Sequence, residues 1–509
     1  MDGWLIALLV LVSYGALVIL LNQVGALQRL SIQAVGPLLI WRTLRFRTFI
    51  EWLSRPGRVW RAFGDFSIGF AFLSMVLMVA LLAWIATQVV RAPAGAVRVE
   101  QIIGLPAINP FIPLWYGIFG LAVAILVHEG CHGVLARAES IAVRSVGLLL
   151  FVVPIGAFVE PDESEMRKAP LRRRLRIFSV GPSSNLVLAL VCALIFSGAL
   201  VGSAKPVGEG AYVEAVFAGS PAHAAGLRPN TLITAIQLEG QAEPVHLAGF
   251  RDFSAILSNS TPLQEVTFHY MTSHDTGTIT FELGEWPADW LAPGENRTSG
   301  FVGVRTVDPS TFLAWARPGE RIMDGCKEAP PTPGIGCVVD SLGAYLRLPV
   351  LGLSPLPPER QWLYQPTGAA AAFGGAFWLV ADAFYWLFWL NFMVGTFNAV
   401  PMLPLDGGHM YRDGVLSFLR RSAARRSGVP GPAEPPPEPT RAAPGLPTPR
   451  EDDDFLGISA DRRPLDEVFG PSRDPLERRA HTITVYTSLA MLALIVWPLV
   501  WSYASYAIR

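Results

Sequence analysis

The sequence predicts a polytopic α-helical membrane protein with about six transmembrane helices and one inserted, small β-rich domain outside the membrane. Its 509 residues are 51% hydrophobic and only 16% charged, whereas soluble domains are about 25% charged. Six apolar runs have roughly the 20 residues that a helix needs to cross a bilayer. A long polar stretch between the fourth and fifth runs contains strand-like alternation. The net charge of −1 gives no indication of nucleic-acid binding.

The apolar runs define the expected spans: Trp4–Leu21, Ser67–Val90, Leu114–Leu135, Ile177–Val201, Ala371–Val394 and Ile483–Tyr503. No basic cluster precedes the first run and no small-residue cleavage site follows it, so we expect a true span and not a cleavable signal. Arginines concentrate in the loops after spans one, three and five. With six spans these loops share one side, which the positive-inside rule assigns to the cytosol. Both termini and residues 202–367 are then expected outside.

Two histidines and a glutamate stand at the end of the third span, in the stretch VHEGCHGVL. His128 and His132 are four residues apart, so on a helix they share one face and can hold one metal ion. Glu129 lies beside them, placed to take a proton from metal-bound water. A chance occurrence is disfavoured, because an ionisable cluster inside a span is costly and usually functional.

A third ligand is expected at the end of the fifth span, in FNAVPMLPLDGGH. Asp406 follows two prolines and precedes two glycines, so the backbone there cannot continue a regular helix. Such irregular backbone at membrane depth is tolerated where it lines a cavity or is buried in protein. Taken alone, Asp406 is typical of a helix cap. Next to a histidine pair at matching depth, near the cytosolic face, a ligand is the favoured interpretation.

Four motifs in order resemble the site-2 protease family of intramembrane zinc metalloproteases: HEGCH at 128–132, PIGAFVE at 154–160, GPSSN at 181–185 and NAVPMLPLDGG at 398–408. The resemblance covers roughly residues 114–410 and implies one Zn²⁺ per chain, bound by His128, His132 and Asp406, with Glu129 as the general base. It also implies that Asn185 holds the substrate or stabilises the oxyanion. The alternative for Asn185 is a hydrogen bond that joins two helices.

The resemblance implies that the PIGAFVE segment forms an extended, membrane-dipping loop whose free edge pairs with unfolded substrate.

Cys131 departs from the family, which usually has glycine at this position. It is either a soft ligand or, as we favour, a small residue at a helix contact. His409 as a fourth ligand would close the open metal position, and Asp382 lies too far along the fifth span to reach the metal.

Residues 206–286 resemble a PDZ domain, through GSPA at 219–222, AGL at 225–227 and the strand-like runs TFHYM and TITFEL. Asn230-Thr231 stands where many PDZ domains have Gly-Asp. PDZ domains capture chain termini by strand addition, so we expect docking or size selection of substrates; a structural cap is the alternative. Cys326 and Cys337 would pair if their stretch faces an oxidising compartment, but two cysteines leave this open.

The expected organisation has seven parts. They are two spans with a basic cytosolic loop (1–112), core spans three and four (113–202), the PDZ-like domain (206–286), an extracytosolic insertion without a readable motif (287–367), core span five (368–414), a cytosolic linker with a Pro-rich disordered stretch (415–480) and span six (481–509).

The predicted function is intramembrane zinc endopeptidase of the cell membrane, acting in regulated intramembrane proteolysis. Its expected partners are transmembrane protein substrates, the lipid bilayer and a peptide terminus at the PDZ-like domain. One alternative is a catalytically inactive relative, disfavoured because Glu129 and all three ligands are present. The other is a polytopic transporter, which predicts repeats and paired broken helices that the sequence lacks.

Overall fold

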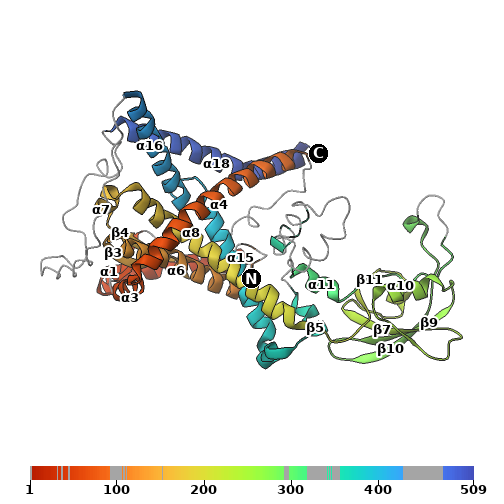
Figure 1. Cartoon of the computed structure of the whole chain (residues 1–509). Helices are drawn as coiled ribbons and strands as arrows, with labels where there is room; N and C mark the ends of the chain where they lie inside the picture. The colour runs from red at the N-terminus through yellow and green to blue at the C-terminus, as the bar shows by residue number, and fades with distance from the viewer. Residues whose placement is uncertain are drawn as a thin grey trace. The chain divides into compact units, whose positions relative to one another are not determined.

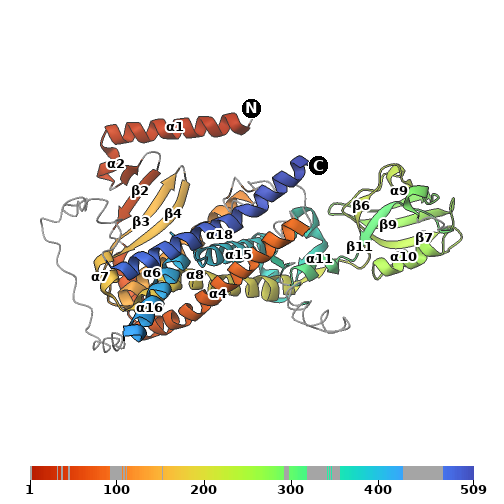
Figure 2. The same ribbon diagram turned by 90° about the horizontal axis from the view of Figure 1, so that it is seen from above.

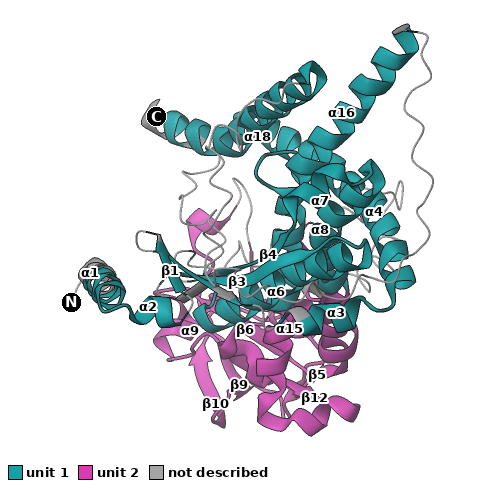
Figure 3. Cartoon of the chain, turned by 90° about the vertical axis from the view of Figure 1, so that its left-hand side faces the viewer, with its two compact units in different colours: residues 1–190, 386–509 teal, residues 191–385 magenta. Residues whose placement is uncertain are grey.

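The computed structural model describes residues 3–30, 32–35, 38–43, 46–91, 112–151, 153–291, 297–317, 356–427 and 474–508, with single residues between them. The chain separates into two compact units (Figure 3). Unit 1 combines residues 1–190 with 386–509, and unit 2 comprises residues 191–385. Each unit is described by itself below.

Five helical segments are long and apolar enough to cross a membrane. They are α4 (Gly57–Arg91), α6 (Leu114–Ala138), Leu171–Ser203 with α8 (Leu171–Leu194), Gly368–Asn398 with α15 (Phe377–Asn398), and α18 (Pro475–Ile508) (Figure 1). These segments correspond to the predicted spans two to six. Helix α1 (Gly3–Gln23) covers the first predicted span but is not among the five, so a sixth span stays a prediction.

Unit 1 contains a four-stranded antiparallel sheet in the order β1-β2-β3-β4 (Figure 2). Its strands are β1 (Ile32–Val35), β2 (Leu38–Thr43), β3 (Val143–Phe151) and β4 (Val153–Pro161). The pairing of β2 with β3 joins the loop after the first predicted span to the loop after the third. The arginine pattern places these two loops on one side, and the compartment on that side stays a prediction. The PIGAFVE segment is extended as expected, and it forms the edge strand β4.

Buried ion pairs connect α8 to three neighbouring elements of unit 1. Arg176 lies 2.6 Å from Glu139, which follows α6, and 2.6 Å from Asp65 on α4. Arg174 lies 2.9 Å from Asp413 on α16 (Asp406–Ser427). Because α6 and α16 carry the predicted metal ligands, these pairs fix both helices against the same partner.

Unit 2 contains a β-rich domain with the strand order β10-β9-β7-β6-β11, and β8 (Val245–His246) pairs with β7. The strands are β6 (Ala211–Val216), β7 (Thr231–Leu238), β9 (Glu265–Met271), β10 (Thr276–Glu282) and β11 (Val304–Val307). Helix α10 (Phe250–Ser258) packs Phe253 and Leu257 into the core of this domain. TFHYM and TITFEL form β9 and β10, as predicted. The sheet also includes β11, so it extends beyond residue 286 into the part assigned to the insertion.

Asn230 explains one departure from the PDZ pattern. Its φ of 64° lies in the left-handed region, which glycine adopts freely and asparagine tolerates better than most residues. The Tyr212 hydroxyl donates a hydrogen bond to the Asn230 side-chain oxygen and holds the turn. Asparagine therefore satisfies the backbone requirement at this position without glycine.

Two further expectations from the sequence concern Asp382 and the cysteines. Asp382 lies within hydrogen-bond distance of Gln361 at 3.5 Å, as a polar contact distant in sequence from the metal ligands. Cys337 is disulfide-bonded, whereas Cys131 and Cys192 are free. Cys326 and most of residues 318–355 of the expected insertion lie outside the described residues.

The Pro-rich stretch of the expected linker also lies outside the described residues. Helix α16 continues into the expected linker as far as Ser427.

Candidate active site

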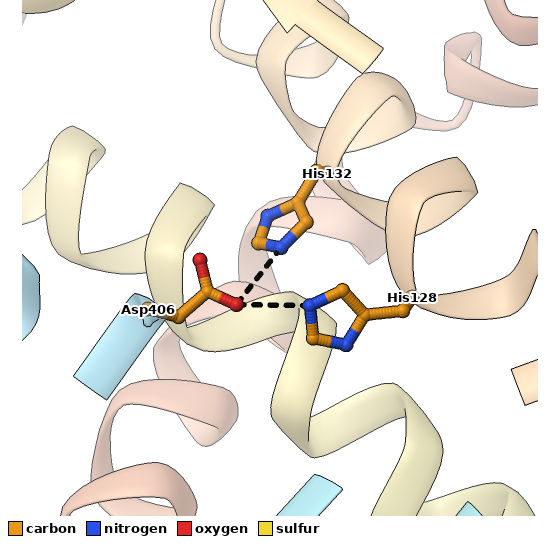
Figure 4. A group of neighbouring side chains, drawn as sticks. All are labelled: His128, His132 and Asp406. Carbon is orange, nitrogen blue, oxygen red and sulfur yellow. Dashed lines mark hydrogen bonds and ion pairs between the residues drawn. The ribbon is translucent and has the colours of Figure 1, made fainter. Parts of the chain in front are cut away.

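The three predicted metal ligands meet inside unit 1 (Figure 4). His128 and His132 lie one turn apart on α6 and are only 5% and 8% exposed. The Asp406 Oδ2 atom lies 2.9 Å from the Nε2 atom of His128 and 3.2 Å from that of His132. One ligand atom from each residue falls within 4.8 Å of the others. Among the described residues, these three side chains form the cluster of potential ligands that could hold a metal ion.

Asp406 reaches the histidines because the chain breaks its helix just before it. Helix α15 ends at Asn398 and α16 begins at Asp406. A Cβ atom on Gly407 would lie 2.3 Å from the Ala399 carbonyl oxygen, so the first turn of α16 packs against the preceding segment only with glycine. Asp406 thus reaches both imidazoles as the first residue of α16, and a carboxylate binds metal in its ionised form.

Helix α8 packs against both histidines. The Nδ1 atom of His132 donates a hydrogen bond of 2.6 Å to the Ile177 carbonyl oxygen, which leaves Nε2 free for a metal. The fully buried Asn185 carboxamide lies 3.4 Å from Nδ1 of His128. Pro182 interrupts the α8 hydrogen-bond ladder between these two residues.

The space in front of the two ligand nitrogens is open because residue 181 is glycine. A Cβ atom there would lie 2.3 Å from His132 Nε2 and 2.8 Å from His128 Nε2, so any side chain would fill the metal position. Two imidazole nitrogens and one carboxylate are a donor set that catalytic zinc takes, with the fourth position left open. The residues present therefore fit a zinc ion.

Comparison with known proteins identifies the family. Residues 116–428, which include the three ligands, match the model of peptidase family M50. The chain belongs to this family. The resemblance to site-2 proteases is thereby confirmed, together with zinc as the cofactor.

This M50 chain is similar to proteins named as metalloproteases. It is 23% identical over 363 residues to metalloprotease MmpA of Caulobacter vibrioides, and 24% identical over 369 residues to zinc metalloprotease Rip1 of Mycobacterium bovis. Each match covers 58% of this chain and 83% of the relative. An uncharacterized protein of Methanocaldococcus jannaschii is 31% identical over 165 residues, which cover 31% of this chain and 43% of that protein.

Glu129 of this M50 chain follows His128 on α6 and is tied to the neighbouring sheet. Its Oε2 atom accepts a hydrogen bond of 3.2 Å from the backbone N–H of Val159 on β4. The predicted base therefore contacts the edge strand that the motif PIGAFVE forms. The catalytic roles of Glu129 and Asn185 stay predictions.

Two further residues weighed from the sequence lie outside this M50 metal centre. Cys131 packs against an apolar cluster that includes Leu135 and Val180, which fits the small helix-contact residue we favoured. His409 stacks its ring on Phe178, with ring centroids 5.0 Å apart.

The sequence did not predict the groups that orient His132 and Glu129, or the residue that leaves space for the metal ion. The carbonyl of Ile177 and the amide of Val159 are main-chain groups, which no residue type reveals. Gly181 is the first residue of the GPSSN motif, and the presence of glycine there was the only indication in the sequence that a side chain is excluded.

Proposed function

We propose that this chain is an intramembrane zinc endopeptidase that hydrolyses peptide bonds within or near transmembrane segments of membrane proteins. The observation that carries the proposal is the convergence of His128, His132 and Asp406 beside Glu129, on a chain whose helices are apolar enough to cross a membrane. A soluble zinc peptidase would not need these helices. A transporter would not need this donor set with an adjacent base.

The chemistry is divided between the metal and Glu129. Zinc, when bound, polarises the scissile carbonyl and lowers the pKa of an attacking water. Glu129 accepts the proton of that water and delivers it to the leaving amine. The N–H of Val159 holds the Glu129 carboxylate in place beside the ligands. The structure thus supports a general base fixed by the backbone of a neighbouring strand.

An unwound substrate segment is proposed to add to β4 as a further strand. Among the described strands, β4 pairs only with β3. Neighbouring residues of an antiparallel edge strand turn their backbone groups alternately toward the partner strand and away from it. The N–H of Val159 points to Glu129, so Ala157, two residues earlier, turns its backbone groups the same way. A strand bound along this edge would run beside the catalytic base.

We further propose that the β-rich domain of unit 2 is PDZ-like and docks a substrate terminus. Its edge strand β11 pairs with β6. A cavity of about 460 Å³ is lined by the residues that follow β11, the segment before β6 and the start of α10, including Asp308, Ser310 and Arg251. A strand edge beside a helix is the arrangement by which PDZ domains bind peptides.

The proposed function is tested by comparing the purified wild type with Glu129→Gln. Both proteins should bind about one zinc per chain, because Glu129 is outside the ligand set. Only the wild type should cleave members of a panel of single-span membrane proteins, since glutamine cannot accept the proton.

Each other outcome identifies what fails. Equal cleavage by both proteins would exclude Glu129 as the base. Absence of zinc from the wild type would exclude a zinc enzyme. Zinc in both proteins without cleavage of any substrate would support the inactive relative.

A further inference from the structure

The carboxamide of Asn185 is buried next to a metal ligand with half of its hydrogen-bonding capacity unused. Its side chain is 0% exposed, and its Nδ2 atom lies 3.4 Å from Nδ1 of His128. The Oδ1 atom has no hydrogen-bond partner among the described residues. A buried amide oxygen without a donor is unfavourable. Exchanging the oxygen and the nitrogen leaves the shape of the side chain unchanged.

The neighbouring ligand shows what His128 requires. His132 donates its Nδ1–H to the Ile177 carbonyl and turns Nε2 toward Asp406. His128 also turns Nε2 toward Asp406. In a neutral imidazole that binds metal through Nε2, the proton resides on Nδ1 and needs an acceptor.

Among the described residues, the Asn185 carboxamide is the group that lies within hydrogen-bond distance of this Nδ1 atom. With its oxygen turned to His128, the buried oxygen gains a donor and the Nδ1 proton gains an acceptor. The exchange therefore matches the proton that a metal-bound imidazole carries on Nδ1, and the carboxamide NH2 group takes the former place of the oxygen.

We propose that the carboxamide oxygen of Asn185 accepts the Nδ1–H of His128 and holds this imidazole with Nε2 presented to zinc. The inference rests on the proposed function, because it assigns a positioning role within the same site. Helix α8 then orients both histidines, one through the main chain of Ile177 and the other through the side chain of Asn185. Such outer hydrogen bonds fix the tautomer and the ring orientation of metal-binding histidines.

Three variants of the full chain test this role in detergent solution. Asn185→Leu keeps the approximate size of the side chain and removes the acceptor. Asn185→Asp keeps an acceptor oxygen at the same place. Ser183→Ala is the matched control, because the buried Ser183 hydroxyl lies on the same helix but donates to the Ser67 carbonyl at 3.2 Å, toward α4.

The main measurement is the zinc dissociation constant of the metal-free proteins, obtained by competition with a chelator. Asn185→Leu should weaken zinc binding by about 10-fold to 100-fold, as loss of an outer hydrogen bond typically does. Asn185→Asp and Ser183→Ala should bind zinc at least nearly as tightly as the wild type. The visible absorption of the cobalt-substituted proteins should change for Asn185→Leu and persist for the other two. If Asn185→Leu does not fold, Asn185→Ala takes its place.

Wild-type zinc affinity in Asn185→Leu would overturn the positioning role, and lost cleavage with intact zinc would assign Asn185 to the substrate instead. Equal weakening by Ser183→Ala would also overturn it, because helix packing would then explain the effect. Failure of the wild type to bind zinc is a separate result, which contradicts the proposed function itself.

Discussion

The absent side chain of Gly181 keeps the space in front of His128 and His132 open. The histidine spacing and the broken segment at Asp406 were both readable in the sequence, because each is a local pattern with a known chemical use. The distances between them were not readable. They depend on how α8 presents Gly181 and the Ile177 carbonyl, and a motif does not specify packing between helices.

Replacing Gly181 by alanine should abolish stoichiometric zinc binding. The new methyl group would lie 2.3 Å from His132 Nε2, so it either displaces the imidazole or occupies the metal position. Metal analysis of the purified protein measures the effect, and the melting temperature reports on folding. Gly198→Ala is the control, since a Cβ atom there meets nothing within 4 Å. Full zinc occupancy in Gly181→Ala would contradict the assigned site.

Replacing Asp406 by alanine should also reduce zinc occupancy strongly. The substitution removes the only anionic member of the three-residue group, and two neutral imidazoles alone hold zinc poorly compared with a three-ligand site. Metal content and the zinc dissociation constant are the measurements. Unchanged zinc binding would remove Asp406 from the ligand set and restore its interpretation as a helix cap.

At the scale of elements, the arginines after the third span have two roles. In the sequence they predict that their loop faces the cytosol. This prediction depends only on how many basic residues the loop contains. In the structure, Arg174 and Arg176 are largely buried and form ion pairs with α16, α4 and the end of α6. Hydropathy is a local property, so the five long apolar helices were predictable. The pairing of β2 with β3, and of β11 with β6, joins distant segments and was not.

Replacing Asp413 by asparagine should destabilise unit 1 clearly. Asp413 is 3% exposed and Arg174 18%, and removing one partner of a buried pair costs roughly 3 kcal/mol or more. The melting temperature in detergent measures the loss. Glu163→Gln is the control, because its pair with Arg167 is exposed on both sides and worth about 0.5 kcal/mol or less. Equal effects of the two substitutions would show that the Arg174 pair does not hold α16.

At the scale of the whole molecule, the zinc site and the β-rich domain belong to different compact units. Six spans and the arginine distribution predict that the β-rich domain faces outward and that the loop carrying β3 and β4 faces the cytosol. The fold of each unit does not decide the compartment, so this part of the prediction depends on charge alone.

Cysteine labelling of intact cells tests this topology. Glu243→Cys places a thiol on an exposed position of the β-rich domain, and Glu163→Cys places one on an exposed position after β4. A membrane-impermeant maleimide should label Glu243→Cys in intact cells and Glu163→Cys only after permeabilisation. The unsubstituted chain provides the background, and the reverse pattern would invert the orientation.

The order of the ligands along the chain has a consequence for biosynthesis. Asp406 follows His128 by 278 residues, so a growing polypeptide carries two ligands long before the third is translated. Nascent chains and prematurely terminated products therefore lack the complete ligand set, and the proposed hydrolysis requires synthesis to have passed Asp406, the first residue of α16.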